Sequence, residues 1–199
     1  MNLRPDLAVI ARHVPVGSRV LDVGCGEGEL MAVLRDERQV DARGMEIDPE
    51  AVEKCVARGL SAIQGDANRD LADYPDGAFD YAVLSQTLQT AERPDLMLDQ
   101  LLRIGRKAFV SFPNFAHWRM RASLMWNGRM PETPSLPHKW YDTPNIHLCS
   151  IDDFHALCRD MGVRVERAIV LNRYSRPIHM PPLLANLFGE QAVFMLRRD

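Results

Sequence analysis

No part of this 199-residue chain is apolar over the length of a membrane span, and its first residues hold no apolar stretch typical of a signal peptide. Neither sign of charge prevails, because the chain has 24 lysines and arginines and 27 aspartates and glutamates, which gives a net charge of −3. Such a balance gives no general attraction to nucleic acid or to an anionic membrane. We therefore expect a cytoplasmic protein that binds neither nucleic acid nor membranes.

Cysteine is scarce, and its spacing follows no pattern. The four residues form no C-x-x-C pair and no metal-ligand spacing, so we interpret them as reduced, mostly structural thiols. His138 and His147 lack spaced acidic or thiol partners, and we predict no metal site. The four cysteines are Cys25, Cys55, Cys149 and Cys158.

The composition that is present, 46% apolar and 26% charged, is typical of a globular protein, and the length fits one domain over residues 1–199. From about residue 19, strand and helix patterns alternate, which favours a mostly parallel sheet with helices on both faces. The sequence thus predicts a three-layer α/β fold with a seven-stranded sheet. Strand patterns cover residues 19–24, 42–47, 60–64, 81–85, 107–112, 163–171 and 191–196, and helical patterns cover residues 5–13, 28–38, 49–58, 94–104 and 150–161.

Three alternating glycines follow the first predicted strand. Asp22, Gly24, Gly26 and Gly28 form the pattern D-x-G-x-G-x-G just before a predicted helix. Glycine permits a sharp turn and the close approach of a ligand, and the unpaired N–H groups at a helix start suit a negatively charged ligand group. The dinucleotide pattern G-x-G-x-x-G would place its third glycine where Glu29 stands. A strand-to-helix turn without any ligand is the alternative interpretation.

This pattern, with Asp22 two residues ahead of Gly24, resembles the first motif of class I S-adenosylmethionine (SAM) methyltransferases. The resemblance implies a Rossmann-like fold and a loop that passes under the methionine half of SAM or S-adenosylhomocysteine (SAH). It also implies that Asp22 faces the amino group of the cofactor, directly or through water. Cys25 lies in the same loop, where a small residue suffices, so we assign it no nucleophilic role.

A carboxylate at the end of the second predicted strand is our candidate ribose ligand. Glu46 lies 22 residues after Gly24, and a carboxylate can accept hydrogen bonds from both ribose hydroxyls. Asp48 competes for this role, but it precedes Pro49 and fits better as the cap of the next helix.

The residues after the third and fourth predicted strands complete the candidate site. By the same resemblance, Asp66 accepts the adenine amino group and Ala67 offers a backbone contact. Ile47 and Leu88 are apolar neighbours of the purine, and residues 85–89 lie beside the methionine half. The predicted cofactor-binding residues are Asp22, Gly24, Cys25, Gly26, Gly28, Glu46, Ile47, Asp66, Ala67, Ser85, Gln86 and Leu88.

The sequence identifies no catalytic residue. Methyl transfer needs mainly alignment and exclusion of water, and a base only for weak nucleophiles. Gln86 and Gln89 stand where many small-molecule methyltransferases carry histidine. We favour packed or surface roles over a general base for the remaining candidates, which are His117, His138, Tyr141 and His147.

A long segment interrupts the alternation of strands and helices. Residues 114–149, the aromatic segment, hold all three tryptophans, four prolines and three of the six histidines. This composition is too aromatic for a disordered region, and a long connection in a compact domain is usually functional. We predict a short helix over residues 116–126 followed by a proline-braced loop. The segment is either a lid or partner surface, or a packed excursion that covers the sheet edge.

Five stretches carry a resemblance beyond the general motifs, namely residues 21–30, 44–48, 84–89, 111–118 and 137–147. Through them the chain resembles the methionine biosynthesis protein MetW family over nearly its whole length. The resemblance implies a complex with the homoserine O-acyltransferase MetX, and it implies no particular methyl acceptor.

Two functions therefore compete. One is a SAM-dependent methyltransferase acting on a small molecule, which the intact cofactor motif favours. The other is a SAM- or SAH-binding partner that supports or regulates the acyltransferase, which the aromatic segment and the lack of an identifiable base favour. We prefer the second.

Overall fold

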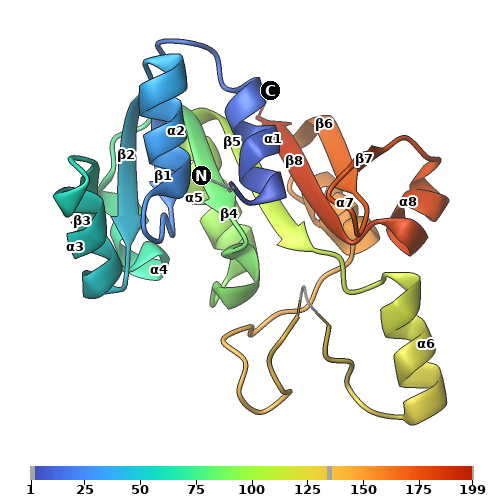
Figure 1. The fold of residues 1–199 in the computed structure, drawn as a ribbon. Coiled ribbons are helices and arrows are strands. Elements are labelled where there is room, and N and C mark those ends of the chain that lie inside the picture. Colours follow the sequence, from blue (N-terminus) through green and yellow to red (C-terminus); the bar gives the residue numbers. More distant parts are fainter. Residues whose placement is uncertain (1–2, 134–135, 199) are drawn as a thin grey trace.

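The computed structural model describes residues 3–133 and 136–198, and its helices lie on both faces of a central sheet (Figure 1). Its strands are β1 (Arg19–Val23), β2 (Asp41–Glu46), β3 (Ser61–Gln64), β4 (Phe79–Ser85), β5 (Gly105–Pro113), β6 (Arg164–Leu171), β7 (Pro177–Ile178) and β8 (Gln191–Arg197). Its α-helices are α1 (Pro5–His13), α2 (Glu29–Arg38), α3 (Pro49–Ala57), α4 (Ala67–Asp70), α5 (Pro94–Ile104), α6 (Trp118–Asn127), α7 (Ile151–Asp160) and α8 (Pro182–Phe188). Two 3-10 turns are η1 (Leu71–Asp73) and η2 (Leu88–Thr90).

The strands lie in the order β3-β2-β1-β4-β5-β8-β6-β7. The first five pair in parallel, and β8, β6 and β7 continue the sheet with antiparallel pairs. The predicted α/β fold with a mostly parallel sheet is confirmed, although the sheet in the described residues has eight strands, not seven. The additional strand, β7, is two residues long and therefore too short to produce an alternating pattern.

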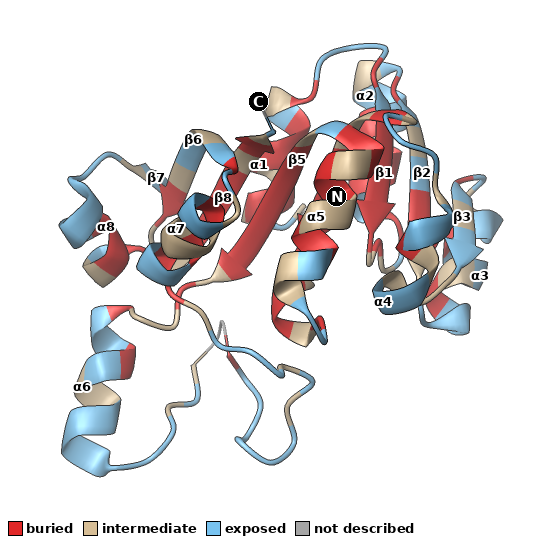
Figure 2. Ribbon diagram, turned by 180° about the vertical axis from the view of Figure 1, so that it is seen from behind, coloured by how far each residue is buried: buried red, intermediate tan, exposed pale blue. Residues whose placement is uncertain are grey.

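Side chains that alternate along the central strands build a core on each face of the sheet. On one face Val20 of β1 packs in a cluster with Ile10 of α1. On the other face the next residue, Leu21, packs in a cluster with Leu101 of α5. Figure 2 shows the resulting burial along the central strands. Both faces of the central sheet are therefore covered by packed helices.

Local signals fix where two helices start. The Asp48 carboxylate accepts a hydrogen bond from the Glu50 N–H at 3.0 Å, so Asp48 caps α3 as expected. Ser150 and Asp153 form a reciprocal capping box at the start of α7, which confirms that predicted helix start. These caps depend only on neighbouring residues, and for that reason the sequence reveals them.

The aromatic segment leaves the carboxyl end of β5 and returns to the sheet at α7. Its predicted helix is present as α6, which lies below the sheet in Figure 1 together with the loop that follows it. The helix buries a single residue, Met120, and most of its surface is exposed (Figure 2). The segment is therefore not a packed cover for the sheet along α6.

Candidate functional site

The glycine loop joins β1 to α2 and is tied to the end of β2. The N–H groups of Gly24 and Cys25 donate to the Met45 carbonyl at 2.8 and 3.2 Å. Gly24, Gly26 and Gly28 have φ values of 70°, 54° and 78°, a region that other residues rarely adopt. The alternating glycines are therefore needed by the backbone itself.

The surroundings of two of these glycines differ. A Cβ at Gly24 would lie 2.6 Å from Oγ1 of Thr87, so the loop sits tightly against the turn after β4. A Cβ at Gly26 would meet no atom of the described residues within 4 Å. The loop is thus fixed on one side and open to a ligand on the other.

The Glu46 carboxylate accepts hydrogen bonds from backbone N–H groups, one of which belongs to the glycine loop. Its Oε2 accepts the Gly26 N–H at 2.8 Å, and its Oε1 accepts the N–H groups of Ile47 and Asp48 at 2.8 and 3.1 Å. Each carboxylate oxygen can accept more than one hydrogen bond. Ile47 is 63% exposed, so most of the apolar side chain beside this carboxylate is open to solvent.

Asp22 is a buried acid without a full set of partners. It lies in β1, is 1% exposed, and its Oδ1 accepts no hydrogen bond from any residue that the structure describes. Burial raises the pKa of Asp22 to about 7, Arg4 opposes that rise, and Glu46 adds to it. An orphaned carboxylate oxygen next to an open glycine loop fits the ammonium group of an amino-acid ligand. The residues present therefore fit SAM or SAH.

The ends of β3 and β4 lie at the same edge of the sheet. The Gly65 N–H donates to the Glu46 carbonyl at 2.9 Å, which places the next residue, Asp66, beside the candidate ribose ligand. The Asp66 side chain caps α4 by accepting the Asn68 N–H at 2.9 Å. Ala67 packs against the core cluster that contains Leu88.

Gln86 has an unusual backbone at the end of β4. Its φ is 55°, a conformation that costs a residue with a side chain about 1–2 kcal/mol. Its N–H donates to the Ser111 carbonyl at 2.8 Å, which holds it against β5. The neighbouring Ser85 Oγ accepts a hydrogen bond from Arg4 Nη2 at 2.9 Å.

Arg4 and Asp6 belong to this region, and sequence reasoning missed both. Asp6 is fully buried; its Oδ2 accepts the Ser111 hydroxyl at 2.7 Å and lies 3.3 Å from Arg4 Nη2. No local pattern marks these residues, because only the packing of α1 against the sheet brings them to the ends of β4 and β5. The first turn of α1 is thus part of the candidate site.

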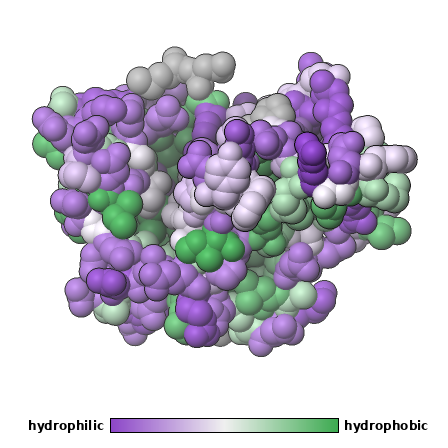
Figure 3. Space-filling model, turned by 90° about the horizontal axis from the view of Figure 1, so that it is seen from below, coloured by the Kyte–Doolittle hydropathy of each residue, from purple (hydrophilic) through white to green (hydrophobic). Residues whose placement is uncertain are grey.

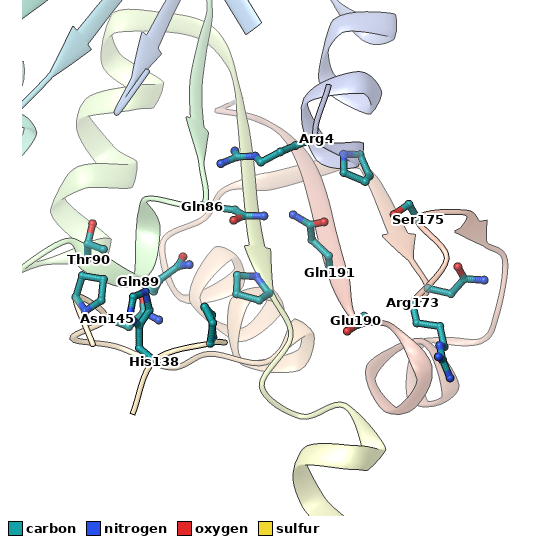
Figure 4. A pocket seen from close by; sticks show the side chains of 15 residues that line it. Arg4, Gln86, Gln89, Thr90, His138, Asn145, Arg173, Ser175, Glu190 and Gln191 are labelled. Carbon is teal, nitrogen blue, oxygen red and sulfur yellow. The ribbon is translucent and has the colours of Figure 1, made fainter. Parts of the chain in front are cut away.

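A cavity of about 550 Å³ opens next to Gln86 (Figure 4). Residues of the aromatic segment form one wall, so this segment lies over the carboxyl ends of the strands. The lining residues are Arg4, Pro5, Gln86, Gln89, Thr90, Pro113, Pro137, His138, Pro144, Asn145, Asn172, Arg173, Ser175, Glu190 and Gln191.

The structure places the four candidate bases in different environments. His138 lines the cavity. His117 is buried as the cap of α6, and burial lowers its pKa. The exposed fraction of Tyr141 is 65%, and the His147 ring contacts the Glu92 carbonyl. Among residues 3–133 and 136–198, no group of three His, Cys, Asp or Glu side chains is arranged to hold a metal ion.

The surface of the aromatic segment is rich in apolar side chains. Seen from below, apolar patches interrupt the polar surface of the molecule (Figure 3). Trp126 and Trp140 are each 74% exposed and Trp118 is 44% exposed. Other exposed apolar residues of the segment are Leu124, Met125, Met130, Tyr141, Ile146 and Leu148. No helix in the described residues is long and apolar enough to cross a membrane.

Comparison with solved structures defines the class. The chain matches a SAM-dependent methyltransferase from Archaeoglobus fulgidus with a TM-score of 0.70 at 14% identity, over 96% of this chain and 91% of the other. It also matches the [4+2]-cyclase SpnF with a TM-score of 0.69 at 17% identity, over 96% and 80%. The fold is that of class I SAM-dependent methyltransferases.

Comparison of sequences then gives the family. Residues 4–196 match the profile of the methionine biosynthesis protein MetW, and the chain belongs to that family. The bifunctional methionine biosynthesis protein MetXA/MetW of Rhodopirellula baltica is 32% identical over all of this chain. This chain spans 33% of that longer protein.

Proposed function

We propose that this chain is a cytoplasmic SAM- or SAH-binding protein that associates with a MetX-like homoserine O-acyltransferase and supports or regulates it. The observation that carries the proposal is the relative in which a MetXA part and a MetW part form one polypeptide. Fusion keeps two proteins together permanently, and separate chains of the same kinds gain the same proximity by binding. The free thiols of all four cysteines agree with a reducing compartment.

In this proposal the glycine loop and Glu46 hold the cofactor. Glu46 accepts hydrogen bonds from the ribose hydroxyls, and Asp22 faces the α-ammonium group. Ile47 and Leu88 flank the adenine, with Asp66 and Ala67 at its edge. When SAM is bound, it supplies an electrophilic methyl group on a sulfonium. The open side of Gly26 and the orphaned oxygen of Asp22 support this placement.

Loss of the Glu46 carboxylate tests the cofactor site. Glu46→Ala should weaken SAH binding by about 1–3 kcal/mol in calorimetry, because charge-assisted hydrogen bonds are lost. Glu50→Ala is a matched control, since Glu50 is an exposed residue of the next helix. Equal SAH affinity in a folded Glu46→Ala protein and in the control would remove Glu46 from the site.

The partner surface in this proposal is the exposed part of the aromatic segment. It combines tryptophan, methionine and arginine, which are enriched in protein interfaces. Arg119 lies on α6 with its guanidinium 5.4 Å from the centre of the Trp118 ring. α6 buries only Met120 in this chain, which leaves its remaining surface for a partner.

Purification of the native complex tests the partnership. The acyltransferase should co-purify with this chain, and its activity should change when the chain is removed and return when it is added back. An acyltransferase that purifies alone with unchanged activity would contradict the proposal.

The second candidate function is methyl transfer to a small molecule, which the cavity beside Gln86 favours. Because the fold is shared with a cyclase, fold alone does not decide the reaction. Gln86 and Gln89 line that cavity where a base is often found, so we expect little transfer to generic acceptors. Incubation of the chain with labelled SAM and cell extract checks this: saturable labelling of one metabolite would favour the methyltransferase.

A further inference from the structure

We propose that Arg4 binds the carboxylate of the amino-acid part of SAM or SAH, while Asp22 faces the ammonium group of the same ligand. The inference rests on the proposed cofactor binding and adds to it a residue from outside the glycine loop. Together the two side chains would form a site for a zwitterion at the junction of α1, β1 and β4.

Arg4 lies beside the end of β4, close to the start of the glycine loop. It directly precedes α1, and its Nη2 donates to Ser85 Oγ at 2.9 Å at the end of β4. In the sheet register Val23 of β1 pairs with Leu84, so Ser85 lies level with the start of the glycine loop. Arg4 therefore reaches the point where the methionine half of the cofactor is expected.

Arg4 also has N–H donors that make no hydrogen bond within the described residues. A guanidinium has five N–H donors, and carboxylates are often bound by two of them in parallel. Within the described residues only Nη2 of Arg4 makes hydrogen bonds, to Ser85 and Asp6. The side chain of Arg4 is 42% exposed and lines the cavity beside Gln86 (Figure 4). Asp6 and Ser85 thus hold the guanidinium in place and leave Nε and Nη1 for a ligand.

Asp22 and Arg4 provide charges of opposite sign in the same region. Arg4 is close enough to act electrostatically on Asp22, and the Asp22 Oδ1 is buried without a hydrogen bond. A positive group with free donors and a negative group with a free acceptor therefore flank one region. An α-amino acid presents the complementary pair, a carboxylate and an ammonium on one carbon. A simple anion would match Arg4 and leave Asp22 unpaired.

A comparison of SAM with decarboxylated SAM, which lacks only the carboxylate, tests this assignment. By calorimetry the unmodified chain should bind SAM about tenfold more tightly than decarboxylated SAM, because charge-assisted hydrogen bonds from Arg4 are lost. Arg4→Gln should bind the two compounds equally. Arg12→Gln is the matched control, since Arg12 is an exposed arginine of α1, the helix that Arg4 precedes, and it should keep the tenfold preference.

Two outcomes would overturn the proposal. One is equal binding of SAM and decarboxylated SAM by the unmodified chain, a result that requires no variant to fold. The other is an Arg4→Gln protein that loses affinity for both compounds by the same factor, which is the signature of a structural role. Absence of SAM and SAH binding in the unmodified chain would instead overturn the proposed function itself.

Discussion

Asp22 is the residue whose burial has the clearest consequence for stability. Its folded-state pKa of about 7 lies above the ordinary value of 3.8, chiefly because burial disfavours the charged form. The folded state therefore binds more protons than the unfolded state between these two values. It follows that Asp22 lowers the free energy of unfolding as the pH rises from about 4 to 7, and that the loss is complete above pH 7.

Asp22→Asn should reverse this loss. At pH 8 the ligand-free variant should be more stable than the unmodified chain by up to about 4 kcal/mol, because each pKa unit corresponds to 1.36 kcal/mol. The same change should weaken SAH binding at pH 8, since the ammonium loses its carboxylate. Urea unfolding and calorimetry from pH 5 to 8 measure both effects, with the exposed Asp73→Asn as control. Unchanged stability and unchanged affinity at pH 8 would contradict the role given to Asp22.

The residues of the candidate site differ in how far the sequence could reveal them. Gly26 follows β1 and Glu46 ends β2, and the regular alternation of strands and helices brings both to one edge of the sheet, where the Gly26 N–H donates to Glu46 at 2.8 Å. Asp6 lies in α1 and Arg4 directly precedes that helix, whose docking is decided by long-range packing. The positive φ of Gln86 could not be predicted from the sequence either, because it depends on how β4 is held against β5.

At the scale of elements, one asparagine anchors the start of the aromatic segment to two helices, α7 and α8. Asn114 is buried; its Nδ2 donates to the carbonyls of Asn186 and Gly189, and its Oδ1 accepts the N–H groups of Ala116 and Ile151. It thereby joins the start of the segment to α7 and α8. These contacts are formed between distant parts of the chain, so the sequence pattern gives no sign of them.

Asn114→Ala should therefore be costly. Loss of four hydrogen bonds at a buried position should lower the free energy of unfolding by about 3 kcal/mol. Asn127→Ala, at an exposed asparagine near the end of α6, should cost under about 0.5 kcal/mol. Chemical denaturation of the two variants checks the difference. Similar small losses for both would show that Asn114 does not anchor the segment.

α6 gives a second prediction at this scale. Trp126→Ala should weaken the complex with the acyltransferase by about 2 kcal/mol or more if this side chain anchors the interface. Because Trp126 is 74% exposed, the thermal stability of the isolated chain should stay the same. Tyr174→Ala, at an exposed aromatic residue between β6 and β7, should leave the complex unaffected. Equal complex affinity in both variants would exclude Trp126 as an anchor.

At the scale of the whole molecule, hydrogen bonds join the turn after β4, beside the glycine loop, to the aromatic segment. The Gln89 carbonyl accepts the N–H groups of Ile146 and His147 at 2.8 and 3.0 Å. Gln89 lies in η2, three residues after Gln86, and the two N–H groups belong to the aromatic segment. We therefore expect a ligand that orders the turn after β4 to influence the segment that carries the exposed tryptophans.

This path makes coupling between cofactor and partner the central expectation. If SAM changes the affinity for the acyltransferase, the acyltransferase must change the affinity for SAM by the same factor. SAM is made from methionine, so such coupling would report the output of the pathway to an early enzyme. The predicted fold made a shared edge of the sheet foreseeable, whereas the hydrogen bonds at Gln89 required the structure.

The most direct test is the dissociation constant of the complex between this chain and the acyltransferase, measured by sedimentation with and without saturating SAH. The account predicts a measurable complex whose affinity changes about fivefold or more when SAH is present, since coupling free energies are typically about 1–3 kcal/mol. The Glu46→Ala chain should form the complex and lose the response to SAH. Absence of a complex, or an identical dissociation constant with and without SAH, would contradict the account.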